Sequence, residues 1–145
     1  MDVRELGRLM KQLSDKMEAT ANANLRTLDL TIAQSRVLLY LGDQPDQTAT
    51  QRELEAHLRV SHATVHGLLT RMEAKGLVRV RPSAADRRMR IVRLNTSDDT
   101  LKKIRAQQKE HMSRVTRDVD VEQLSRMLQI MLENQEKYLT DGEMG

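Results

Sequence analysis

The middle of the chain carries an excess of positive charge that could bind phosphate. Residues 51–95 contain ten Lys and Arg against four Asp and Glu, whereas the segments before and after them are close to neutral. Nine of these ten cations are Arg, whose planar guanidinium suits contacts with phosphates and base edges. A local basic zone of this kind is the footprint of a module that binds a polyanion. A solvated basic face is the alternative that charge alone leaves open.

Two histidines in the basic zone have the spacing of metal ligands. His62 and His66 are four residues apart, so that both lie on one face of a helix. A zinc site needs at least one more ligand, and the chain has no Cys. The remaining candidates are scattered along the chain: His57, Glu110 and His111. We therefore expect neither a metal nor a cofactor.

The sequence lacks the residue patterns of the common catalytic sites. It has no glycine-rich phosphate loop, no zinc-protease histidine pair and no nucleophile elbow. The neighbours Ser61 and His62 would point in different directions on a helix, so they do not form a catalytic dyad. The absence of Cys also excludes thiol catalysis, thiol oxidation and disulfides. We expect the protein not to be an enzyme.

Two short helices and the break between them position the histidines. Capping-box spacing at residues 31–34 and 50–53 predicts the starts of a second and a third helix. Ser61 is a good N-cap for a fourth helix over about 62–75, and Gly76 is placed as its C′ residue. Two short helices joined by a brief break are typical of a helix-turn-helix.

After the fourth helix the apolar pattern changes to strict alternation. Residues 78–81 predict a strand with both Arg on its open side, and residues 90–94 predict the returning strand. The tip of this hairpin carries Asp86, Arg87 and Arg88. A helix-turn-helix followed by such a hairpin is a winged helix-turn-helix.

Long helices are predicted at both ends of the chain. Leu6, Met10, Leu13 and Met17 form one apolar stripe of a helix over about 3–26. Thr96 or Ser97 caps a later helix, and the last helix starts at Asp120. The apolar stripes of these helices have few partners inside so small a core, and such stripes usually pack on another chain. We therefore expect a mainly α fold with a small β-hairpin wing, in which long terminal helices join a homodimer.

The longest apolar run, residues 37–41, is far too short to span a membrane. The first five residues include three charged ones, Asp2, Arg4 and Glu5, and no apolar signal region follows them. We expect a cytoplasmic protein that has no membrane partner.

Residues 54–94 resemble the multiple-antibiotic-resistance regulator (MarR) family of bacterial transcription factors. The run from Val60 to Val78 is similar to the family's recognition helix and its exit. Arg81-Pro82, Asp86-Arg87-Arg88 and Val92-Arg93-Leu94 are similar to its wing signature. The resemblance implies a dimer joined through terminal helices, here residues 1–30 and 96–145, and a DNA-binding domain over residues 31–95. It also implies a ligand cleft between the terminal helices and the DNA-binding lobe.

Three positions depart from the family's pattern. Gly67 stands in mid-helix, where a larger DNA-reaching side chain is common, and it lowers helix propensity by about 1 kcal/mol relative to Ala. Val80 stands where Arg is common, which removes one phosphate contact. Asn95 replaces the usual Thr after Leu94, which can shift the cap of the following helix.

The resemblance assigns most DNA contacts to the recognition helix, whose N-terminal part enters the major groove. The residues expected to contact bases or phosphates there are Ser61, His62, Thr64 and His66. Arg71 is expected to clamp a phosphate further along the helix. Capping is the alternative for Ser61, and an ion pair with Glu73 or Asp86 is the alternative for Arg71.

The wing supplies the other expected contacts. Arg88 and Arg87 can insert into a narrow minor groove, where the negative potential is strongest. Asp86 would be repelled by phosphate, so we expect it to orient an Arg of the wing.

We therefore expect a dimeric, sequence-specific regulator that binds double-stranded DNA, and more narrowly a ligand-responsive repressor of a pseudo-palindromic operator. An aromatic acid as small-molecule inducer would need a cation and an apolar wall. The candidates on the appropriate helices are Arg26, Arg36, Tyr40, His111 and Met112. A winged-helix module that binds proteins and a sequence-blind architectural DNA binder are the alternatives. Five Arg between positions 79 and 90 favour DNA over a protein partner.

Overall fold

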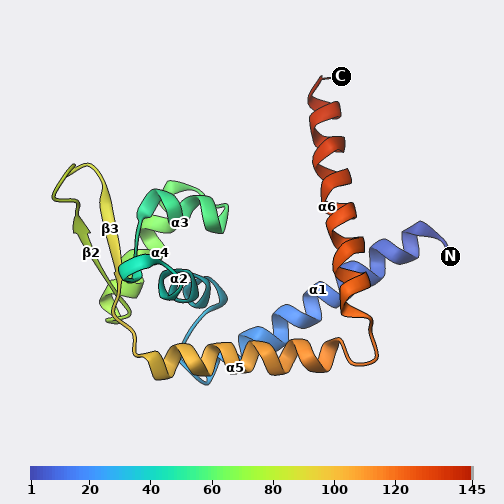
Figure 1. The fold of residues 1–145 in the computed structure, drawn as a ribbon, viewed down its shortest axis with the longest axis horizontal. Coiled ribbons are helices and arrows are strands. Elements are labelled where there is room, and N and C mark those ends of the chain that lie inside the picture. Colours follow the sequence, from blue (N-terminus) through green and yellow to red (C-terminus); the bar gives the residue numbers. More distant parts are fainter. Residues whose placement is uncertain (145) are drawn as a thin grey trace. The chain divides into compact units, whose positions relative to one another are not determined.

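The computed structural model describes residues 1–144, which divide into two compact units, residues 1–108 and the segment from 109 onward. Figure 1 labels the helices and strands in chain order. The first unit begins with helices α1 (Val3–Arg26) and α2 (Ile32–Gly42), a 3-10 turn (Pro45–Gln47) and strand β1 (Thr48–Thr50). It continues with helices α3 (Gln51–Leu58) and α4 (His62–Ala74), strands β2 (Val78–Pro82) and β3 (Arg90–Leu94), and most of helix α5 (Asp98–Val115). The second unit holds the end of α5 and helix α6 (Val121–Met144).

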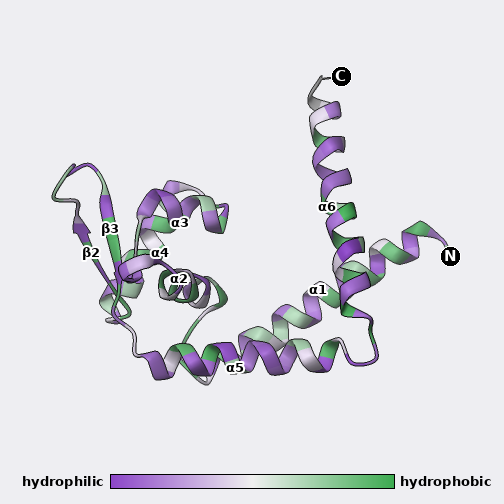
Figure 2. Cartoon of the chain, in the orientation of Figure 1, coloured by the Kyte–Doolittle hydropathy of each residue, from purple (hydrophilic) through white to green (hydrophobic). Residues whose placement is uncertain are grey.

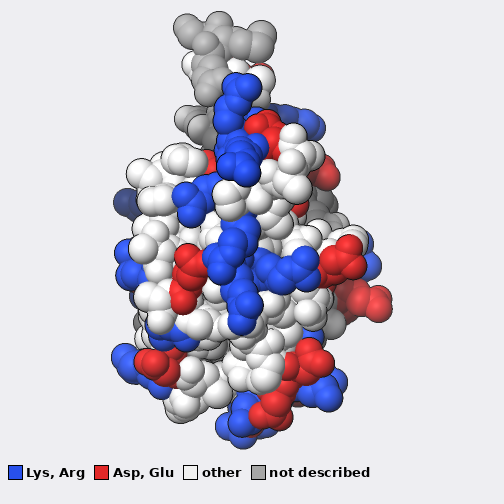
Figure 3. Space-filling model, turned by 90° about the vertical axis from the view of Figure 1, so that its left-hand side faces the viewer, with Lys and Arg blue, Asp and Glu red and all other residues white. Residues whose placement is uncertain are grey.

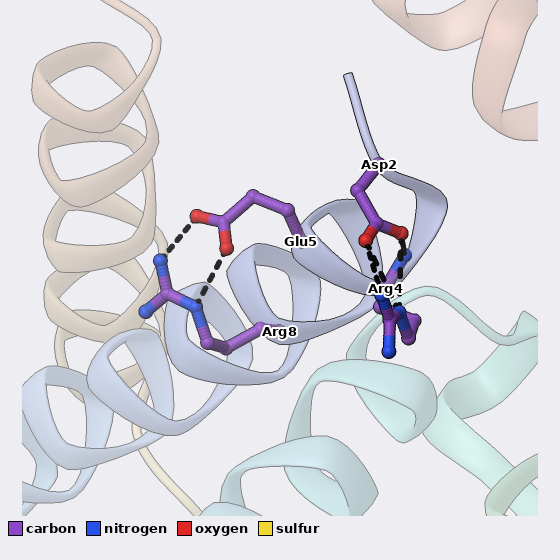
Figure 4. A network of polar contacts seen from close by, with 4 residues as sticks. All are labelled: Asp2, Arg4, Glu5 and Arg8. Carbon is purple, nitrogen blue, oxygen red and sulfur yellow. Dashed lines mark hydrogen bonds and ion pairs between the residues drawn. The ribbon is translucent and has the colours of Figure 1, made fainter.

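Helix α1 starts at Asp2, whose side chain accepts a hydrogen bond from a free backbone N–H of the first turn (Figure 4). The Asp2 carboxylate accepts a hydrogen bond from the Arg4 backbone N–H at 2.8 Å, and it also pairs with the Arg4 guanidinium at 2.8 Å. The side-chain hydrogen bond from Arg4 lowers the pKa of the Asp2 carboxyl. Glu5 and Arg8 form a further ion pair three residues apart, which raises the pKa of Arg8. Negative charge in the first turn also favours the helix through its dipole.

The two helices of the helix-turn-helix begin at the caps that the sequence predicted. Thr50 accepts a hydrogen bond from the Glu53 N–H at 3.0 Å, which starts α3. Ser61 accepts one from the Thr64 N–H at 3.2 Å, which starts α4. Between them, Arg59 adopts a left-handed conformation (φ 57°) that ends α3 and turns the chain. The full capping box is present at α2, where Thr31 and Gln34 bond each other's backbone N–H.

The C-terminal end of α4 is closed by a Schellman motif. Gly76 has φ +76°, and its N–H donates to the Glu73 carbonyl at 3.0 Å while the Leu77 N–H donates to the Met72 carbonyl at 2.9 Å. This pairing satisfies two of the helix's last carbonyls and needs a left-handed residue at position 76, which confirms the C′ assignment of this glycine.

The β-structure is a three-stranded antiparallel sheet of order β1-β3-β2. Strands β2 and β3 form the predicted hairpin, in which Val80 lies opposite Val92 and Pro82 opposite Arg90. Strand β1 was not predicted; it pairs on the other edge of β3, with Ala49 opposite Val92. The hairpin is therefore anchored on both sides of β3, and its tip projects from the first unit (Figure 1).

One aliphatic core holds the first unit together. Its fully buried large side chains come from α2, α3, α4, the sheet and α5, and they are Leu38, Leu41, Leu54, Met72, Ile104, Val37, Val65, Val78 and Val92. No aromatic ring is among them, in agreement with a chain that has only two Tyr and no Phe or Trp. The same core packs against one face of α4, so the opposite face of that helix is fixed toward solvent.

The second unit has no comparable core. None of its side chains described by the structure, residues 109–142, is buried. Figure 2 shows hydrophobic residues recurring between hydrophilic ones along α6. A groove of about 580 Å³ runs between the end of α5 and α6, lined by apolar residues that include Met112, Leu128 and Leu132. No described helix is long and apolar enough to cross a membrane.

Candidate nucleic-acid interface

Helix α4 separates its buried residues from its polar ones. Val65, Leu68, Leu69 and Met72 are buried in the core. The predicted contact residues His62, Thr64, His66 and Arg71 are all exposed. Helix α4 thus presents its polar face to solvent, with Ser61 at its start.

Ser61 and Thr64 bond each other at the start of this helix. Besides accepting from the Thr64 N–H, the Ser61 hydroxyl donates to the Thr64 hydroxyl oxygen at 2.9 Å. Ser61 thus has the capping role that the sequence left as its alternative. The Thr64 hydroxyl keeps its own hydrogen, which remains available as a donor to a base or a phosphate.

The ring of His62 is held by the preceding helix. Its Nδ1 atom lies 3.2 Å from Oε2 of Glu55 and 3.3 Å from Nε2 of Gln51, both on α3. His66 lies one turn further along, and the two imidazole rings are near parallel with their centroids 6.4 Å apart. Within residues 1–144, no group of three or more His, Asp or Glu is placed to hold a metal ion.

Arg71 makes no ion pair with a described residue. Glu73, which the sequence offered as its alternative partner, instead bonds Arg81 of β2 at 3.2 Å and the Val80 backbone N–H at 2.8 Å. The other proposed partner, Asp86, instead contacts Arg88. The Arg71 guanidinium is therefore free for an external anion.

The wing tip is a closed turn with two exposed arginines. Asp86 accepts the Arg88 backbone N–H at 3.0 Å and lies 3.8 Å from the Arg88 Nε atom. The turn is closed at its base because the Ser83 N–H donates to the Met89 carbonyl at 2.8 Å. Arg87 and Arg88 both extend into solvent. Ser83 was not among the predicted residues, although its hydroxyl also accepts the N–H of Ala85 at 3.2 Å. A Ser after Pro in a turn is the signal that could have indicated it.

The outer face of the β2–β3 hairpin carries more arginine than the tip alone. Arg79 lies directly opposite Arg93 across the two strands, and Arg81 follows on the same face. Like charges opposite each other destabilise a sheet, so this arrangement favours a negatively charged partner. Figure 3 looks onto this side of the molecule and shows Lys and Arg side chains gathering across its middle.

A cleft of about 590 Å³ joins the start of α4 to the wing. One wall is formed by α3 and His62, and the other by the wing residues Arg88, Met89 and Arg90. The cleft therefore brings together three of the predicted residues, His62, Asp86 and Arg88, whereas Thr64, His66, Arg71 and Arg87 do not line it.

The predicted inducer residues are divided between the two units. Arg26 and Arg36 are exposed in the first unit, and Tyr40 is half-buried against the core, with its ring stacked on His57 at a centroid distance of 4.3 Å. Met112 lines the groove of the second unit, and His111 is half-buried beside it in the sequence.

The sequence and the fold both match known proteins of one family. Residues 28–89 match the sequence model of the MarR family. The fold is similar to that of a mutant of E. coli MarR in complex with operator DNA, with a TM-score of 0.72 and 22% identity over 90% of this chain and 94% of that one. AbsC, a MarR family transcriptional regulator from Streptomyces coelicolor, gives a TM-score of 0.76 and 20% identity over 94% and 97% of the two chains.

A third solved structure concerns regulation by a small molecule. Bordetella bronchiseptica BpsR, whose DNA binding is regulated by 6-hydroxynicotinic acid, gives a TM-score of 0.74 and 21% identity over 89% of this chain and 91% of that one. Among curated protein sequences, none matches this chain at a significant level. The match of residues 28–89 covers the helix-turn-helix and most of the wing, and the similarity of fold extends over nearly the whole chain. Residues 28–89 thus match the MarR family in sequence, and the rest of the chain is similar to solved structures of that family in fold alone.

Proposed function

We propose that this protein is a transcription regulator that binds double-stranded DNA through α4 and the wing, and that it has no enzymatic role. The observation that carries the proposal is the cleft that joins His62, at the start of the exposed side of α4, to Arg88 and Arg90 of the wing. Helix α4 would lie in the major groove, with His62, Thr64 and His66 near the bases and Arg71 on a phosphate. Arg87 and Arg88 would enter the adjacent minor groove, with Asp86 orienting Arg88.

The assembly that fits this role is a homodimer. Residues 1–30 and 96–145 would join the two copies, and residues 31–95 would bind DNA. The support for this division is the exposed apolar residues of α1 and α6, which have no cover in the single chain. Two copies related by a two-fold axis would read a pseudo-palindromic operator with half-sites about one helical turn apart. A regulator that binds chromosomal DNA acts in the compartment that holds the chromosome, so a cytoplasmic location is part of the proposal.

A small-molecule inducer is the further part of the proposal. BpsR, which shares the fold, responds to an aromatic carboxylic acid. Arg26, Arg36, Tyr40, His111 and Met112 remain the candidate ligand contacts, since they combine cations with an aromatic ring and an apolar wall. Repression would end when the ligand favours a spacing of the two DNA-binding lobes that no longer matches successive major grooves.

The experiment that tests the proposal selects binding sites from a pool of random duplexes and repeats the affinity measurement across salt concentrations. A palindromic consensus together with a steep salt dependence is the expected result. Binding that depends on salt but not on sequence would instead identify an architectural DNA binder. No binding at low salt would favour the remaining alternative, a winged-helix module for a protein partner. Repeating the titration with aromatic acids tests the ligand response, which is absent if none of them weakens the complex.

A further inference from the structure

His62 is the first residue of α4, and residues of α3 determine which of its ring nitrogens carries the proton. The His62 side chain is 73% exposed, so its ring extends toward solvent. Its inner nitrogen, Nδ1, nevertheless contacts two residues of α3, Glu55 and Gln51. These two residues are four apart on one face of α3, and Glu55 is only 21% exposed. The ring is thus anchored on one side and free on the other.

The chemistry of Glu55 decides where the ring proton lies. An ionised carboxylate only accepts hydrogen bonds, so the 3.2 Å contact is a hydrogen bond only when Nδ1 carries the proton. Hydrogen bonds to a charged group are about twice as strong as neutral ones. Glu55 therefore outweighs Gln51, whose amide nitrogen is a donor and would need Nδ1 to be unprotonated.

Gln51 is compatible with this assignment when its amide is turned. The side chain is 4% exposed, and its Oε1 atom has no partner among the described residues. Turning the amide by half a rotation brings Oε1 to the position 3.3 Å from Nδ1, where it accepts from the same N–H as Glu55. Both neighbours then favour one tautomer of the ring.

We propose that Glu55 is a positioning and specificity-determining residue that acts through His62. By holding the proton on Nδ1, it leaves Nε2 of the neutral ring as a hydrogen-bond acceptor facing outward. In the major groove an acceptor pairs with the exocyclic amino group of cytosine or adenine. Without Glu55, a protonated Nε2 would pair with the acceptors of guanine or thymine instead. The inference rests on the proposed function, since it assumes that His62 contacts a base.

The tautomer is tested first in the free protein, without DNA. Histidine ring nitrogens are observed by 15N NMR in uniformly labelled protein at slightly alkaline pH, and the His62 signals are identified as those lost in His62→Ala. We expect the pattern of a ring protonated on Nδ1. In Glu55→Gln the pattern should move toward a ring protonated on Nε2. Glu53→Gln removes the same charge from the same helix without touching His62, and it should leave the pattern unchanged.

The base preference is tested second, with the selected operator. At one position on one strand of each half-site, the native protein should prefer cytosine or adenine over guanine or thymine, by about fivefold, the lower end of the cost of one mismatch. His62→Ala should abolish that preference, Glu55→Gln should shift it toward guanine or thymine, and Glu53→Gln should retain it.

Failure of this inference is distinct from failure of the proposed function. A native His62 ring protonated on Nε2, or a Glu55→Gln ring identical to the native one, overturns the inference even if operator binding is strong. A preference that is unchanged in Glu55→Gln also overturns it. A native protein that binds no DNA overturns the proposed function through the selection experiment, whereas the NMR result still decides the tautomer.

Discussion

At the scale of single residues, the two arginines of the wing tip differ in how they are held. Arg88 has its backbone N–H bonded to Asp86 and its guanidinium near the same carboxylate, whereas Arg87 has no such contact within residues 1–144. A side chain that is already restrained loses less conformational entropy when it binds. Arg88 is therefore the better-prepared of the two to enter a minor groove.

We predict that Arg88→Ala weakens DNA binding on all sequences alike. The salt dependence of the affinity should fall by about one unit of its logarithmic slope, because one phosphate-directed cation is lost. Fluorescence anisotropy with the selected operator, repeated at several salt concentrations, measures both quantities.

Arg8→Ala is the matched control for this variant. It removes one exposed cation from α1, far along the chain from the wing, where Arg8 pairs with Glu5. The control should keep the native slope. If Arg88→Ala also kept the native affinity and slope, Arg88 would have no part in DNA binding.

At the scale of elements, the glycine inside α4 and the glycine just after it differ in backbone conformation. Gly76 closes the helix at φ +76°, and a Cβ there would meet no atom within 4 Å. A side chain at this position is therefore opposed by backbone strain and not by a clash. Gly67 lies inside the helix, where a Cβ would meet only the end of the Arg71 side chain at 3.5 Å, an ordinary contact distance.

We predict opposite stability changes for alanine at these two positions. Gly76→Ala should lower the free energy of unfolding by about 1 kcal/mol, the cost of a left-handed conformation for a residue with a side chain. Gly67→Ala should raise it by up to about 1 kcal/mol, the difference in helix propensity. Urea denaturation followed by circular dichroism measures both. Equal midpoints for the native protein and Gly76→Ala would contradict the strain assigned to the helix end.

The caps and the alternation in the sequence predicted most elements because they are local. Ser61 and Gly76 act through contacts within a few residues of themselves, and the paired residues of the two wing strands are at most 16 positions apart. Strand β1 was missed because its three residues are too few for their alternation to be distinctive, and its last residue, Thr50, also caps α3. Its pairing with β3 joins residues more than forty positions apart.

The candidate site was predicted less completely, for the same reason. The residue types on α4 and the wing tip are the basis of the contacts with DNA that we propose. The partners that hold those residues came from other elements: Glu55 for His62, and Glu73 for Arg81. Such contacts depend on how α3 and the wing pack on α4, which no local pattern encodes.

At the scale of the molecule, the second unit lacks a core of its own. Leu132 of α6 is 64% exposed and lines the groove between α5 and α6, together with Met112 and Leu128. Large apolar faces of this kind are characteristic of contacts between subunits. We therefore propose that a second copy of the chain packs against α6 and buries its apolar face.

We predict that Leu132→Glu dissociates the dimer. A charge buried in an apolar interface without a partner costs several kcal/mol, so the dissociation constant should rise by at least about a hundredfold. Sedimentation equilibrium measures it, and the melting temperature should depend on protein concentration.

Gln123→Glu is the control, because it adds the same charge to an exposed position of α6 that lies nine residues, about two and a half turns, before Leu132 and so on the opposite side of the helix. The control should remain a dimer at the same concentrations. The proposal that α6 forms the interface would be contradicted if the native protein sedimented as a monomer. It would also be contradicted if the Leu132→Glu variant remained a dimer.

The two tyrosines give the protein one natural optical reporter in each unit. Tyr40 lies half-buried in the first unit, with its ring against His57, while Tyr138 lies 75% exposed on α6. No Trp is present to mask their emission. Tyr138→Phe therefore leaves a protein whose fluorescence reports unfolding of the winged domain alone, and Tyr40→Phe leaves one whose signal follows assembly. The order in which the two events occur during denaturation can be read without attaching a dye.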